Sequence, residues 1–152
     1  MNDISVIGLD AVVWAGWGLV TSYAAHRLPA RVLDHDTWLT RTRPWEAQVS
    51  RRLRVRRWQR LLPEAGRVFG GRSKRRVGGR GSPTLERYAA ETRRAEVVHW
   101  LGFVPLIAFL FWNPAPLWLV MAAYATAANV PCVLSLRANR ARIGRVLRRR
   151  GA

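Results

Sequence analysis

The sequence predicts an all-α integral membrane protein with about three membrane-spanning helices and a basic, partly helical cytoplasmic segment. The 152 residues are room for one domain, and 49% of them are hydrophobic. Lys and Arg number 26 against 9 Asp and Glu, which gives a net charge of +17. The cations are segregated: none lies in 1–26 or 95–136, nineteen lie in 27–94, and the remaining seven lie in 137–150. Apolar blocks that alternate with basic blocks are typical of membrane proteins.

Composition excludes several other classes of protein. The apolar content excludes a disordered basic tail. Cys132 is the only cysteine, so no disulfide framework is expected. One Cys and three His offer no paired-ligand spacing, so we expect no metal and no bound cofactor. We expect no nucleic-acid partner, because nucleic-acid binding would not account for the long apolar blocks.

The first predicted span covers 4–25 and carries a single charge, Asp10. A helix needs about 20 apolar residues to cross a bilayer, so this segment is long enough. No basic region precedes it, and we therefore do not expect a cleaved signal peptide.

The second apolar block, 97–136, has no charged side chain and is long enough for two spans. Two prolines at Asn113-Pro114-Ala115-Pro116 predict the turn between them. The predicted spans are therefore 97–112 and 117–136, and 1–152 forms a single membrane domain.

The positive-inside rule gives the orientation. The basic segment 26–96 and the basic tail 137–152 face the cytoplasm, and the protein is a multi-pass protein of the cell membrane. Three short spans make a thin bundle, so a homo-oligomer is an open possibility.

The cytoplasmic segment divides into several parts. Asp36–Leu62 is predicted to be helical, with an apolar face that includes Trp45 and an arginine-rich face suited to an anionic leaflet. Residues 70–81 are Gly-rich and basic and predict a loop. Ser82-Pro83-Thr84 predicts the start of a helix that continues without a break into the second span.

The stretch ETRRAEVVHW, Glu91–Trp100, could carry chemistry. On a helix Glu96 and His99 lie on one face, and a carboxylate that orients an imidazole is an arrangement for general-base catalysis on a hydroxyl. The alternative is structural: an interfacial ion-pair cluster with Arg93 and Arg94, next to a histidine at the membrane boundary.

Asn129 is the other candidate, because a neutral amide within an apolar span must find a polar partner. It could donate to a developing oxyanion, or it could hydrogen-bond a neighbouring helix. The sequence leaves both readings open.

These residues resemble the glycosyl-4,4'-diaponeurosporenoate acyltransferase family. The resemblance rests on Glu91–Trp100 (family pattern ETxRAExxHW) and on AANVPCVLSLRANRARIGRVL from Ala127 (pattern NxPxxxxQRYNRPRL). His26-Arg27-Leu28-Pro29 fits an RxP segment, and WQRLLPEAG from Trp58 fits a W-K-x-x-L-P block. The similarity spans roughly 26–148.

The sequence also departs from the family pattern. Gln59 stands where Lys is usual, and Leu136, Ala138 and Ala141 replace a Gln, a Tyr and a Pro. The resemblance implies a small membrane enzyme that acylates a sugar hydroxyl of a glycosylated carotenoid, as in staphyloxanthin-type pathways. The departures leave another hydroxylated or glycosylated lipid open as the acceptor.

The resemblance assigns no catalytic roles, but acyl transfer from a thioester to a hydroxyl needs a base and an oxyanion donor, and we expect His99 to be the base. Glu96 or Glu91 would orient the imidazole, and Asn129 or Asn139 would polarise the thioester carbonyl.

Arginines would bind the acyl donor, which is acyl-CoA or acyl carrier protein. The expected substrate-binding residues are Arg93, Arg94, Arg137, Asn139 and Arg140, of which the four arginines would bind the donor. The alternative function is a non-catalytic membrane accessory subunit whose polybasic loop binds anionic lipid or an acidic partner.

Overall fold

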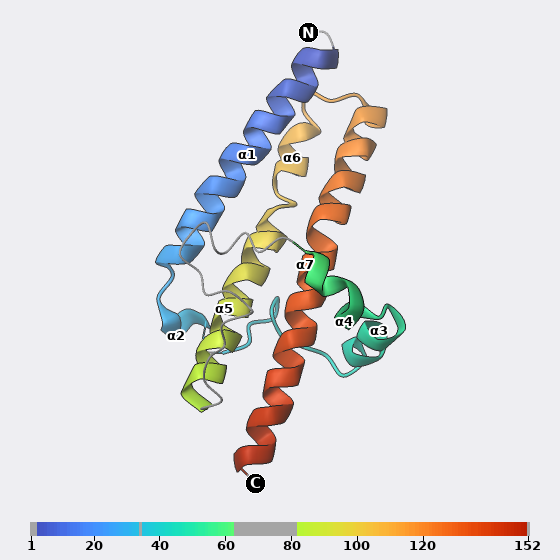
Figure 1. Ribbon diagram of the computed structural model, residues 1–152. Helices are drawn as coiled ribbons and strands as arrows, with labels where there is room; N and C mark the ends of the chain where they lie inside the picture. Colours follow the sequence, from blue (N-terminus) through green and yellow to red (C-terminus); the bar gives the residue numbers. More distant parts are fainter. Residues whose placement is uncertain (1–2, 34, 63–81, 152) are drawn as a thin grey trace.

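The computed structural model describes residues 3–33, 35–62 and 82–151, and every regular element in these ranges is helical. Three helical stretches run side by side along the molecule (Figure 1). They comprise α1 (Asp3–Arg27), α5 (Ser82–Leu101) followed by α6 (Pro105–Phe109), and α7 (Ala115–Gly151). The short elements are α2 (Ala30–Leu33), α3 (Glu46–Arg52), α4 (Val55–Trp58) and the 3₁₀ helix η1 (Gln59–Leu61).

Two helices are long and apolar enough to cross a membrane: α1 over Ile4–Arg27 and α7 over Ala115–Arg149. They contain the first and the third predicted spans. Large apolar side chains on α1 are open to the surroundings, with Ile4 81% and Val12 71% exposed. A core helix of a soluble protein would bury such side chains.

The second predicted span is built differently from our expectation. We expected an unbroken helix, but α5 ends at Leu101 and α6 starts at Pro105 after a turn. Pro105 has no N–H, so the Leu101 carbonyl loses its usual helical partner. Two indoles of α1 compensate: Trp17 Nε1 donates to the Leu101 carbonyl at 2.8 Å and Trp14 Nε1 donates to the Gly102 carbonyl at 3.0 Å.

The interrupted segment nevertheless continues along the bundle. Figure 1 shows α6 between α1 and α7, and α6 packs against both. The predicted turn at 113–116 is confirmed, because α7 begins at Ala115. Asp10, fully buried on α1, accepts hydrogen bonds from Trp112 Nε1 at 2.8 Å and from Asn113 Nδ2 at 2.7 Å. These contacts fasten α1 to the turn that joins α6 and α7.

The helix predicted for Asp36–Leu62 is shorter than expected and is divided. Residues 38–40 and 44–45 form turns with irregular chain between them, and α3 begins only at Glu46, after Pro44. Arg54 separates α3 from α4 in a left-handed conformation with φ 49°. The Gly-rich segment 70–81 lies outside the described residues.

The basic tail is a direct continuation of the last apolar helix. A single helix, α7, runs through Pro131 to Gly151, and its second half carries arginines along α5. The start of α5 at Ser82 agrees with the predicted helix start. The packing of α5 against α7 forms the frame for the candidate site.

Candidate functional site

The Glu96 carboxylate lies at the centre of an ion-pair cluster between α5 and α7. Its side chain is completely buried. Oε1 lies 2.6 Å from Arg137 Nε and Oε2 lies 2.6 Å from Arg140 Nη2. Trp100 Nε1 also donates to Oε1, at 3.3 Å. Two guanidinium groups and an indole therefore provide the compensation that a buried carboxylate requires.

The same two arginines reach the segment before α3. Arg137 Nη1 lies 2.6 Å from Glu46 Oε1, and its Nη2 donates to the Leu39 carbonyl at 2.6 Å. Arg140 donates to the Thr40 carbonyl. The cluster therefore holds α5, α7 and the chain around residues 39–46 together.

Arginines of the ETRRAE stretch fasten the chain that follows α1. Arg93 Nε lies 2.7 Å from Asp36 Oδ1, and Nη1 donates to the Leu33 carbonyl at 2.9 Å. Arg94 Nη1 lies 2.6 Å from Glu91, and Nη2 donates to the Leu28 carbonyl at 3.2 Å. These two arginines have internal partners, as do Arg137 and Arg140. The structure therefore gives an architectural contact to each of the four arginines expected to bind the donor.

His99 and Asn129 form a second polar centre, one turn of α5 beyond Glu96. His99 Nδ1 lies 3.0 Å from Asn129 Oδ1, and both side chains are half-buried. Asn129 Nδ2 donates to the Ala125 carbonyl at 2.9 Å, which orients the amide with its oxygen toward the imidazole. An amide oxygen only accepts, so Nδ1 carries the proton. When the ring is neutral and Nδ1 carries its proton, Nε2 is the basic nitrogen.

Gly102 makes room for this pair. A Cβ built at Gly102 would lie 2.8 Å from Asn129 Oδ1, closer than real Cβ contacts allow. The backbone of the turn after α5 therefore touches the amide that contacts His99. Only a glycine fits here without moving Asn129.

The predicted site residues are thus sorted into two groups. We expected Glu96 to orient His99, but the Glu96 carboxylate binds Arg137 and Arg140, and the imidazole hydrogen bond goes to Asn129. The expected polar partner of Asn129 is found.

Glu91 pairs with Arg94, and Asn139 lines a cavity beside α7. Sequence analysis missed Asp36, Glu46 and Gly102. The sequence does single out Asp36 and Glu46, because acidic residues are rare in a strongly basic segment.

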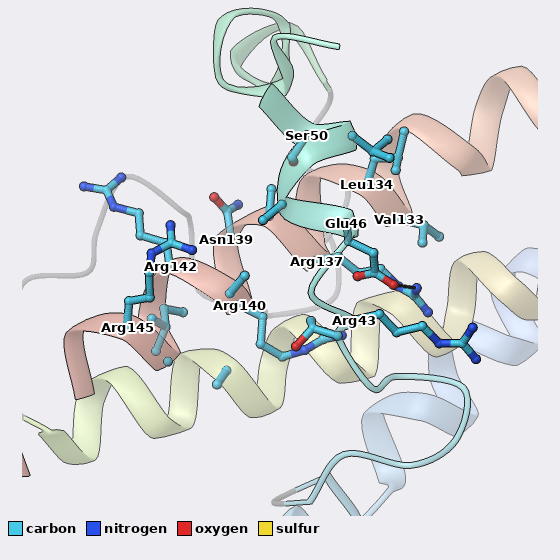
Figure 2. A pocket seen from close by; sticks show the side chains of 18 of the residues that line it. Arg43, Glu46, Ser50, Val133, Leu134, Arg137, Asn139, Arg140, Arg142 and Arg145 are labelled. Carbon is cyan, nitrogen blue, oxygen red and sulfur yellow. Dashed lines mark hydrogen bonds and ion pairs between the residues drawn. The ribbon is translucent and has the colours of Figure 1, made fainter. Parts of the chain in front are cut away.

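The cavity has a volume of about 1380 Å³ and lies along α7 beneath α3 (Figure 2). Figure 2 shows the Glu46–Arg137 ion pair in its wall, with Arg142 and Arg145 farther along α7. Among the described residues, no three His, Cys, Asp or Glu side chains form a group that could hold a metal ion.

Comparison with known proteins identifies the family. The profile of the glycosyl-4,4'-diaponeurosporenoate acyltransferase family matches residues 35–149. The chain belongs to this family. It is therefore an acyltransferase, and the matched range includes every residue of the Glu96 cluster and of the His99–Asn129 pair.

Individual members of this family are similar to the chain over different lengths. The glycosyl-4,4'-diaponeurosporenoate acyltransferase of Staphylococcus haemolyticus (strain JCSC1435) is 28% identical over 142 residues, which are 89% of this chain and 81% of the relative. The enzyme of Staphylococcus aureus (strain bovine RF122 / ET3-1) is 39% identical over 75 residues, which are 46% of this chain and 44% of the relative. No solved structure matches the chain.

Proposed function

We propose that the protein transfers a fatty acyl group from a thioester to a sugar hydroxyl of a glycosylated carotenoid at the cytoplasmic face of the cell membrane. The names of its relatives support this acceptor, because they describe acyl transfer to glycosyl-4,4'-diaponeurosporenoate. The same acyl-transfer reaction would apply to any hydroxylated lipid that reaches the site from the bilayer.

The hydrogen bond between His99 and Asn129 is the observation that carries the proposal. A general base needs a defined tautomer and a defined ring orientation. Asn129 supplies both, since its own amide is oriented by the Ala125 carbonyl. In this proposal His99 Nε2 accepts the proton of the acceptor hydroxyl.

The transfer proceeds through a tetrahedral intermediate. The hydroxyl oxygen attacks the thioester carbonyl while its proton moves to Nε2 of His99. The tetrahedral intermediate collapses, the carbon–sulfur bond breaks, and the imidazolium returns the proton to the departing thiolate. An ester and a free thiol result, and the histidine is neutral again.

Glu96 and Glu91 act as positioning residues in this proposal. The Glu96 ion pairs join α5 to α7 and so fix the register that brings His99 to Asn129. Asn139 lies ten residues beyond Asn129 on α7, about 15 Å along the helix, too far to polarise the same carbonyl. We therefore assign Asn139 to donor binding and not to the reacting centre.

We further propose three spans, with the segment 97–112 crossing beside α1 and α7. The exposed apolar side chains of α1 and α7 support this arrangement, since lipid tails would cover them. The basic segments lie together at the end of the bundle that holds α2 and the C-terminus (Figure 1). The positive-inside rule then orients this end toward the cytoplasm.

Replacement of His99 by alanine tests the mechanism. We expect His99→Ala to lower the rate of ester formation by about 10²–10⁴-fold, because the general base is lost. Membranes that contain the variant would be supplied with acyl donor and acceptor, and the ester would be measured by lipid mass spectrometry. His26→Ala, which removes an exposed histidine at the end of α1, is the matched control. Ester formation by His99→Ala at the unmodified rate would contradict the mechanism.

A further inference from the structure

The cavity along α7 is lined by far more positive than negative charge. Its lining contains twelve arginines and two carboxylates, Asp36 and Glu46. Both carboxylates already form ion pairs, with Arg93 and Arg137 respectively. The cavity therefore has a large surplus of positive charge that its own acidic residues do not neutralise.

Nine of these arginines differ from the structural ones. Arg93, Arg137 and Arg140 belong to the ion-pair network described above. The other nine make no ion pair with any other residue that the structure describes. They are Arg43, Arg51, Arg54, Arg56, Arg57, Arg142, Arg145, Arg148 and Arg149. Their convergence on one cavity from α7 and from the chain between residues 43 and 57, which includes α3 and α4, favours a ligand with several negative charges.

Arg140 gives independent support from within the cavity wall. Its side chain is 5% exposed, yet Nη1 has no hydrogen-bond acceptor among the described residues. A buried guanidinium N–H without an acceptor is costly, so a ligand oxygen at this position would satisfy it.

The lining of the cavity also contains apolar side chains that are close in sequence to His99 and Asn129. They include Trp100 on α5, Phe103, and Val130 and Val133 on α7. Phe103 lies in the turn that follows α5, four residues after His99, and Val130 is adjacent to Asn129 in sequence. One cavity is thus lined both by unpaired arginines and by apolar side chains that are close in sequence to the proposed base.

On the basis of the proposed acyl transfer, we propose that this cavity binds the acyl donor as a coenzyme A thioester. The nucleotide phosphates lie on the arginines of α3 and α7, and the pantetheine arm runs along α7 toward His99. Arginine suits this role because its planar donors bind phosphate in a bidentate manner. The nine arginines are exposed, and they share one cavity with apolar side chains of α5 and α7. A coenzyme A thioester matches this combination, because it joins a polyanionic nucleotide and an apolar acyl chain in one ligand.

Binding of unacylated coenzyme A tests the site directly. The full chain would be placed in nanodiscs of zwitterionic lipid, and the dissociation constant would be measured by calorimetry. We expect Arg142→Gln/Arg145→Gln to weaken binding at least about tenfold and Arg142→Lys/Arg145→Lys to recover part of it. Arg52→Gln/Arg87→Gln is the control, because it removes the same charge from exposed positions outside the cavity.

Other results would overturn the proposal. Equal weakening by both glutamine double variants would reduce the site to general electrostatic attraction. Absence of coenzyme A binding, with phosphatidylglycerol lost selectively from Arg142→Gln/Arg145→Gln in native mass spectrometry, would assign the cavity to a lipid headgroup. Ester formation with acyl carrier protein as the donor, and none with acyl-CoA, would contradict the assignment of the cavity to coenzyme A and also its assignment to a lipid headgroup. His99→Ala should bind coenzyme A normally, so a failure of the catalytic proposal remains distinguishable from a failure of this one.

Discussion

Two polar centres lie one turn apart on α5 and face the same helix, α7, but they differ in charge and burial. Glu96 is fully buried, and two arginines hold its two carboxylate oxygens. His99 is half-buried and hydrogen-bonds a neutral amide, Asn129. The first centre is saturated by opposite charge, whereas the second pairs the imidazole with an uncharged amide. Under the proposed mechanism, this difference separates a residue that holds helices together from one that takes up a proton.

The contrast follows from the cost of burying charge. A carboxylate without partners is unfavourable in a dry interior, so the Glu96 cluster requires both arginines to be present. An amide carries no net charge, so its burial requires only hydrogen-bond partners. The His99–Asn129 pair therefore depends on close geometry, and the Glu96 cluster depends on charge balance.

The largest expected effect on stability comes from Glu96→Ala. Removal of the carboxylate leaves the buried Arg140 and the half-buried Arg137 without their shared partner, which we expect to cost about 3–5 kcal/mol of folding free energy. The midpoint of thermal unfolding in detergent would measure the loss. Glu86→Ala removes an exposed carboxylate from the same helix and should leave the midpoint nearly unchanged. An equal, small effect of both variants would contradict the structural role of Glu96.

Asn129→Leu should show the opposite pattern. We expect kcat to fall about 10–100-fold, because the imidazole loses the hydrogen bond that orients it. The thermal midpoint should change little. Thr126→Val is the matched control, since Thr126 also donates to a carbonyl four residues earlier on α7 but is exposed to the surroundings. A large loss of stability with unchanged kcat in the folded fraction would place Asn129 with the structural centre.

The sequence predicted the helical class, two of the long apolar helices and the turn at 113–116, because these depend on composition and prolines. It could not predict the partner of Glu96. The spacing of Glu96 and His99 permits a contact, but the choice depends on which α7 side chains face α5. That register is set by the break at Pro105 and by Arg137, which lies far along the chain.

Gly102→Ala tests the close geometry of the His99–Asn129 pair, the proposed catalytic pair. The new methyl group would lie 2.8 Å from Asn129 Oδ1 and push the amide away from His99. We expect kcat to fall about tenfold, equivalent to about 1.4 kcal/mol of transition-state stabilisation. Gly16→Ala is the control, because a Cβ there meets nothing within 4 Å. If both alanine variants kept full kcat, the tight contact at Gly102 would have no role in orienting His99.

The smallest predicted effect concerns the indole that supports the helix break. Trp17→Phe removes the donor to the Leu101 carbonyl but keeps an aromatic ring, and we expect a loss of about 1 kcal/mol of folding free energy. The break sets where Gly102 meets Asn129, so kcat should also decline, by less than for Gly102→Ala. Trp38→Phe, at a position that is 84% exposed, controls for the loss of an indole. A stability loss without any change in kcat would mean that α1 supports the bundle but does not set the geometry of the catalytic pair.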